Sequence, residues 1–104
     1  MSQKAVAWAM KLNLHYQQKI ALLVICDYHD SSSGKCNPPP VTEIANICGM
    51  PRSYLMRALR DLKEKGFVEV FSRYENGRRT TNEYILNIQE SGAAPVENLY
   101  DDEN

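Results

Sequence analysis

The chain has 104 residues, a length that suits one domain rather than two. Its hydrophobic content of 43% is ordinary for a globular protein. A chain this short can close one core but retains little material for a deep substrate cleft. The net charge of -1 gives no direct support for a polyanionic partner. No run approaches the roughly 20 apolar residues that a membrane span requires, so we expect no membrane partner.

The charge is unevenly distributed along the chain. Residues 1–88 hold all 12 basic residues and 8 of the 13 acidic ones, which gives this part a net charge of +4. Residues 89–104 hold the other five acidic residues and no basic residue. This last segment shows no hydrophobic period, so we predict a basic folded domain over 1–88 and a disordered acidic tail over 89–104.

The three cysteines, Cys26, Cys36 and Cys48, show no CxxC spacing. An odd number of cysteines, with no signal peptide before them, predicts a reducing cytoplasm and no disulfide framework. Cys26, His29 and Cys36 could supply three zinc ligands, but a fourth ligand of suitable spacing is missing. We therefore predict no metal and no other cofactor, and we expect core or surface thiols.

The first half of the chain predicts two helices. Residues 3–12 place Val6, Met10 and Ala9 on one face, with Trp8 to the side. Residues 16–29 predict a stronger helix with an apolar face and a solvent-facing side. The apolar positions are Ile20, Leu23, Val24 and Tyr28, and the solvent-facing positions are Gln17, Gln18 and Lys19. Residues 30–35 read as a loop, and the prolines at 38–40 then stiffen the chain before a new helix start.

Two further helices follow with only a short turn between them. Residues 41–48 predict a short helix that ends at Gly49, since a left-handed position favours a residue without Cβ. Pro51 opens the next helix, over about 51–65, and Gly66 closes it. The expected inward residues are Ile44, Ala45 and Cys48 in the first helix and Leu55, Ala58, Leu59 and Leu62 in the second. A turn of about three residues between two helices is the spacing of a helix-turn-helix.

After Gly66 the hydrophobic period changes from that of a helix to that of a strand. Residues 67–71 predict a strand, residues 75–80 a hairpin connection around Asn76-Gly77, and residues 84–88 the returning strand. The predicted fold class is therefore mainly α with a small antiparallel β wing. We expect one winged helix-turn-helix domain over 1–88, in which residues 1–14 form an N-terminal helical extension.

From about residue 5 to residue 88, the sequence resembles the winged helix-turn-helix domains of phage and plasmid replication-initiation proteins and related regulators. The resemblance rests on residues 5–10, 19–24, 34–39, 41–45 with Gly49-Met50, and most specifically 55–68. It implies a sequence-specific double-stranded DNA-binding protein of the bacterial host cytoplasm or nucleoid. The implied role is replication initiation or transcriptional regulation of a phage or mobile element. Pro40 and Pro51 depart from the pattern, because Ser or Thr usually caps these two helices.

The candidate DNA-binding residues lie on the second helix of the predicted motif and on the wing. They are Arg52, Ser53, Tyr54, Met56, Arg57 and Arg60 on the helix, and Arg73, Arg78 and Arg79 on the wing. Arginine is the usual bidentate reader of guanine, so Arg52, and after it Arg57, is the candidate for a base contact. Arg57 and Arg60 suit phosphates, and the wing arginines suit phosphates or a minor groove.

Ordinary structural roles compete with these assignments. Asp61 stands four residues after Arg57, and Glu64 stands four residues after Arg60. Ion pairs within the helix could therefore engage both arginines in place of DNA. The alternative for the wing is an ordinary soluble hairpin tip. Trp8, with Val6 and Met10, either packs within the domain or forms a homodimer through the N-terminal helices.

The alternative function is a winged-helix protein-protein interaction module that binds a host or replication protein. The acidic tail could solubilise the chain, compete for its basic surface, or offer Val96, Leu99 and Tyr100 to a protein partner. We expect no enzyme. The chain has no phosphate loop, no HExxH and no Gly-x-Ser-x-Gly, and His15 and His29 lie near opposite ends of one helical segment.

Overall fold

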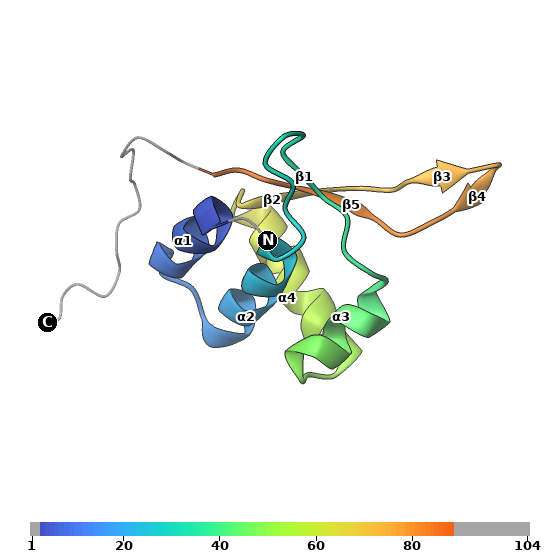
Figure 1. Ribbon diagram of the computed structural model, residues 1–104. Coiled ribbons are helices and arrows are strands. Elements are labelled where there is room, and N and C mark those ends of the chain that lie inside the picture. The colour runs from blue at the N-terminus through green and yellow to red at the C-terminus, as the bar shows by residue number, and fades with distance from the viewer. Residues whose placement is uncertain (1–2, 89–104) are drawn as a thin grey trace, which may run out of the picture.

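The computed structural model describes residues 3–88, which form a helical body with a small antiparallel sheet and a protruding wing (Figure 1). The elements in chain order are α1 (Gln3–Lys11), α2 (Tyr16–Cys26), β1 (Lys35–Cys36), α3 (Val41–Cys48), α4 (Arg52–Glu64), β2 (Val68–Phe71), β3 (Tyr74–Glu75), β4 (Arg78–Arg79) and β5 (Glu83–Leu86). The predicted fold class, a winged helix-turn-helix, is confirmed. The predicted tail at 89–104 lies outside the described residues.

The turn between α3 and α4 is built as the sequence predicts. Gly49 has a φ of 73°, and the Met50 N–H donates to the Ala45 carbonyl at 3.1 Å, so the left-handed residue ends α3 and reverses the chain. Pro40 and Pro51 occupy the N-cap positions of α3 and α4, and neither supplies a side-chain hydrogen bond. Both helix starts therefore rely on the fixed φ of proline.

The wing is a long β2–β5 hairpin whose outer part is the two-stranded ribbon of β3 and β4 (Figure 1). Asn76 and Gly77 connect the ribbon strands with φ values of 53° and 77°. Positive φ at both central residues is the type I′ turn that Asn-Gly predicts.

Three short strands were not predicted from the sequence. β3 and β4 flank the Asn76-Gly77 turn, where the sequence predicts only a connection over 75–80, and the third is β1. Lys35, expected at the end of a loop, begins β1, which pairs with β5 to make a three-stranded sheet of order β1-β5-β2. A two-residue strand is too short to show a period in the sequence. Its partners, Tyr84 and Ile85, are distant in the chain, so only the tertiary fold creates this strand.

The inward face of α1 differs from the prediction. Ala5, Trp8 and Ala9 are buried, whereas Met10 is 58% exposed and Val6 is only partly buried. The Trp8 ring packs edge-on against Phe67 with ring centroids 6.1 Å apart. Trp8 thus contributes to the core of its own chain and fastens α1 to the segment that follows α4.

The inward face of α2 was also predicted wrongly. Its buried residues are Ala21, Leu22, Ile25 and Cys26, and the helix ends at Cys26 rather than at residue 29. Ile20 is 36% exposed, while Leu23, Val24 and Tyr28 are partly buried. The physical reason is that α2 packs against α1, α3 and α4, so apolar residues are required around much of its circumference and no single stripe is evident.

Lys19, expected on the solvent-facing side of α2, instead caps the C-terminal end of α1. Its Nζ donates to the carbonyls of Ala9, Met10 and Leu12 at 3.1, 2.8 and 2.6 Å. The last carbonyls of a helix have no partner within the helix and carry its partial negative charge. The ammonium group therefore joins α1 to α2 electrostatically.

Candidate nucleic-acid interface

The helix α4 has one buried stripe and a wide exposed side. Leu55, Ala58, Leu59 and Leu62 are buried, as the sequence predicts. The predicted DNA-binding residues of this helix are all exposed, namely Arg52, Ser53, Tyr54, Met56, Arg57 and Arg60. The side chains expected to reach a ligand and those expected to form the core are thus separated on opposite sides of α4.

The exposed side of α4 has a centre and two edges. With 3.6 residues per turn, Ser53, Arg57 and Arg60 are the predicted residues that point most directly away from the buried stripe, and Glu64 shares this direction in the last turn. Arg52 and Met56 lie along one edge of this face. Tyr54 lies along the other edge, and the Arg57 guanidinium stands over its ring, with Cζ 5.9 Å from the ring centroid.

The ion pairs that the spacing within α4 allows, Arg57 with Asp61 and Arg60 with Glu64, are not formed. No ion pair within residues 3–88 includes Arg57 or Arg60. Asp61, the expected partner of Arg57, instead accepts a hydrogen bond from Gln18 Nε2 at 3.1 Å. The central arginines of α4 are therefore available to an external anion.

The three wing arginines differ in their surroundings. Arg73 makes an ion pair with Glu75 at 3.4 Å and donates to Asn37 Oδ1 at 3.4 Å, so it joins the wing to the segment before α3. Arg79 is exposed and donates to Asn82 Oδ1 at 3.0 Å. Arg78 is exposed and takes part in no ion pair within residues 3–88. Within residues 3–88, Arg78 and Arg79 therefore have no acidic partner, whereas Arg73 already has a structural role.

The strand register gives the ribbon two chemically different faces. Residues directly opposite in an antiparallel pair project to the same side. Glu75 lies opposite Arg78, on the side that also carries the Arg73–Glu75 ion pair. Tyr74 lies opposite Arg79, on the other side. The Tyr74 side, which contains no acidic residue of the ribbon, is therefore the better match for a polyanion.

Tyr74 was not among the predicted site residues. It is 65% exposed, an unusual position for a large aromatic side chain next to two arginines. The sequence does indicate an aromatic residue near the wing tip, since Tyr74 directly precedes the Glu-Asn-Gly-Arg turn. Without the register, the side to which it projects could not be assigned.

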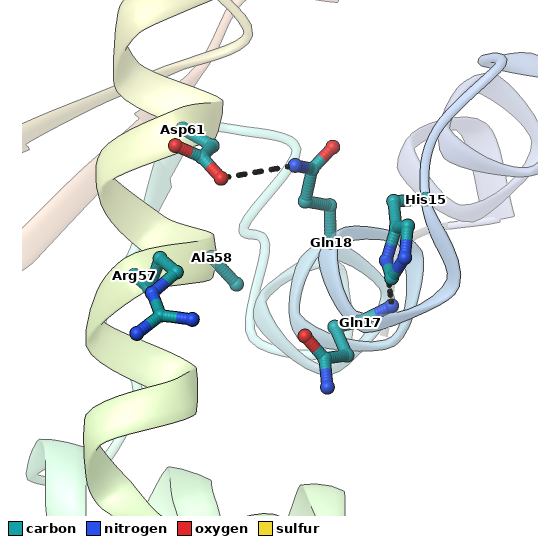
Figure 2. Close-up of a pocket in the computed structure, with 6 residues that line it drawn as sticks. All are labelled: His15, Gln17, Gln18, Arg57, Ala58 and Asp61. Carbon is teal, nitrogen blue, oxygen red and sulfur yellow. Dashed lines mark hydrogen bonds between the residues drawn. The ribbon is translucent and has the colours of Figure 1, made fainter.

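A second feature missed by the sequence analysis is a groove between the start of α2 and the middle of α4 (Figure 2). It has a volume of about 260 Å³, and its lining residues are His15, Gln17, Gln18, Arg57, Ala58 and Asp61. His15 is the N-cap of α2, and its Nδ1 accepts a hydrogen bond from the Gln17 backbone N–H at 3.4 Å. The groove combines residues that are about 40 positions apart in the chain, so no local sequence motif predicts it.

The cysteines and histidines do not assemble a metal site. Within residues 3–88, no three His, Cys, Asp or Glu side chains are close enough together to hold a metal ion. Cys26 and Cys36 are fully buried, and burial raises the pKa of each thiol to about 12. Both are protonated core residues at neutral pH. No helix in the described part of the chain is sufficiently long and apolar to cross a bilayer.

A short turn joining two helices, followed by a β wing, defines the chain as a winged helix-turn-helix protein. The family model of the helix-turn-helix domain matches residues 12–68, which is more than half of the chain. The chain therefore belongs to the helix-turn-helix domain family, and this membership indicates DNA binding. The match extends from the end of α1 to the start of β2 and includes all of α2, α3 and α4. No curated protein matches the chain.

Proposed function

We propose that the chain is a sequence-specific double-stranded DNA-binding protein, and not an enzyme, that acts in replication initiation or transcriptional regulation of a phage or mobile element. The observation that carries the DNA-binding part is the exposed centre of α4, where Ser53, Arg57 and Arg60 project with no ion pair to Asp61 or Glu64. The replication or regulatory role is supported by the resemblance described above.

The shape of α4 suits the major groove of B-DNA, which is wide enough to admit one helix. In that position Ser53 approaches base edges, while Arg52 and Met56 approach them from one edge of the helix. Arg57, beside α2, suits a phosphate. Met56, 42% exposed, offers an apolar surface to thymine methyl groups. Arg60, further along the helix, suits a phosphate.

The wing supplies the second part of the binding surface. Arg78 and Arg79 at its tip extend the positive charge beyond the helical body (Figure 1). Most of the binding free energy is expected from phosphate neutralisation, which is independent of sequence, and α4 supplies the discrimination.

The experiment is a fluorescence-anisotropy titration of the full chain against a random-sequence duplex at low and moderate salt. Binding that weakens steeply with added salt supports a nucleic-acid surface and is followed by selection of a preferred site. No binding even at low salt would refute the proposal and favour the protein-interaction alternative.

Two variants then test the division of roles. Arg52→Ala is expected to relax sequence preference, because it removes a candidate base reader. Arg79→Ala is expected to weaken binding to all sequences alike, because it removes a phosphate contact on the Tyr74 side of the ribbon. If the two variants behave identically on the selected site and on random DNA, the assignment of roles is wrong.

A further inference from the structure

We infer that the groove between α2 and α4 seats a phosphate of the DNA strand that borders the major groove, with Gln17 and Arg57 as its principal donors. This inference rests on the proposed function and extends the binding surface to a helix outside the helix-turn-helix itself.

The position of the groove is the first reason. When α4 lies in a major groove, a sugar-phosphate strand runs along each side of the helix. The α2–α4 groove opens directly beside Arg57, which belongs to the outward centre of α4 (Figure 2). The start of α2 is therefore the element that meets the strand on this side.

The second reason for placing a phosphate in the groove is the chemistry of its lining residues. Arg57 on α4 and Gln17 on α2 lie on facing sides of the groove, and both carry N–H donors (Figure 2). His15 Nδ1 accepts the Gln17 backbone N–H, so the proton of the neutral ring is on Nε2, which makes the ring a donor as well. A volume of about 260 Å³ is ample for a phosphate group.

Asp61 is the one unfavourable group in the groove. Its Oδ2 accepts from Gln18 Nε2 at 3.1 Å, which holds the carboxylate toward α2 but leaves its negative charge in place. Removing this charge, while keeping an acceptor for Gln18, is therefore expected to improve phosphate binding. Asp61→Asn makes this change without altering the size of the side chain.

Gln17→Glu is the decisive variant. It replaces a donor by a negative charge at the groove, so affinity for a random-sequence duplex should fall about tenfold at low salt. The loss should shrink as salt screens the charge, and sequence preference should not change. The first turn of α2 contains no acidic residue, and an acid there is favoured by the helix dipole, so folding is not endangered.

Gln3→Glu is the matched control. It makes the same chemical change in the first turn of α1, which likewise contains no acidic residue. α1 and α3 lie on opposite sides of α2, so this change is placed away from the helix-turn-helix (Figure 1). We expect Gln3→Glu to change affinity by less than about twofold, and Asp61→Asn to raise affinity about threefold. Unfolding curves of each variant, followed through Trp8 fluorescence, establish that the fold is intact.

The phosphate seat can fail without the failure of the proposed function. If the unaltered chain does not bind duplex DNA even at low salt, the proposed function fails and this inference fails with it. If the unaltered chain binds and Arg57→Ala weakens it, but Gln17→Glu matches Gln3→Glu, only the phosphate seat is refuted. A tenfold loss for Gln17→Glu together with a gain for Asp61→Asn establishes the seat.

Discussion

Gln18 and Asp61 are joined across the α2–α4 contact by a hydrogen bond of 3.1 Å from the amide Nε2 to the carboxylate Oδ2 (Figure 2). The other end of the same amide is also held, because Lys65 Nζ donates to Gln18 Oε1 at 3.3 Å. Asp61 is positioned by spacing to pair with Arg57, yet it is engaged by another helix. A contact between two helices thus keeps the central arginine of α4 available.

Arg57→Ala is therefore expected to weaken binding to every duplex, by about tenfold at low salt, and to reduce the salt slope by about one. Lys63→Ala is the matched control, since it removes one positive charge from the edge of the same helix. Both are measured by the anisotropy titration. Equal losses for the two variants would mean that only net charge matters, contrary to the geometry described above.

The two faces of the wing ribbon allow a similarly matched comparison. Arg78 and Arg79 are adjacent, exposed and identical in type, but Arg78 lies opposite Glu75 while Arg79 lies opposite Tyr74. Glu75 offsets part of the positive potential on its own side of the ribbon, so we expect DNA to approach the Tyr74 side.

Arg79→Ala should consequently weaken DNA binding about threefold more than Arg78→Ala at low salt. Tyr74→Ala should also weaken binding, because an aromatic ring packs well on sugar and base surfaces. Glu75→Ala, on the opposite face, should leave affinity unchanged or raise it. If Arg78 proves the more important arginine, the wing contacts DNA through the other face.

The α4 part of the site was predictable because one local pattern encodes it. Leu55, Leu59 and Leu62 fix which side of the helix is buried, so the exposed side follows from helical periodicity alone. The α2–α4 groove was not predictable in this way, since Gln17 and Arg57 approach each other only when two helices pack. The face of Tyr74 similarly required the strand register.

The errors in the two N-terminal helices have a related cause. Met10 is larger and more hydrophobic than Ala9, so the sequence favoured it as a core residue, yet Ala9 is buried and Met10 is not. Close approach of α1 to α2 requires small side chains at the contact. Hydrophobicity identifies candidates for burial, but the separation between neighbouring helices decides among them.

The buried thiols predict a fall in stability at high pH. Burial raises the pKa of Cys26 and Cys36 from 9.0 to about 12, so the folded chain retains two protons that the unfolded chain releases. Stability from this source is fully present below pH 9.0 and is lost as the pH rises from there toward 12.

The test compares urea midpoints at pH 8 and pH 10 for the unaltered chain and for a Cys26→Ala/Cys36→Ala variant. The cavities left by the substitutions lower stability equally at both pH values. The decrease between the two pH values should nevertheless be smaller in the variant, because it lacks the two thiols that titrate. An unchanged decrease would show that other groups account for the pH dependence.

Lys19 provides the last prediction, because three carbonyls at the end of α1 depend on one ammonium group. Lys19→Met keeps the length and much of the apolar stem of the side chain but removes every donor. The free energy of unfolding should fall by about 1–2 kcal/mol, since the helix end loses its hydrogen bonds and its countercharge. Lys11→Met, at an exposed position of α1, serves as the control.

The part of the chain that loosens in Lys19→Met distinguishes loss of the α1 cap from a general effect of removing one positive charge. Trp8 is on α1 and packs against Phe67, so loosening of α1 should change the Trp8 fluorescence before global unfolding. We expect an early fluorescence transition in Lys19→Met, while far-ultraviolet circular dichroism still reports most of the helix content as intact. Coincident transitions with an unchanged midpoint would mean that Lys19 does not hold α1 in place. Duplex affinity at low salt should be little affected, because α4 and the wing do not depend on α1 for their charges.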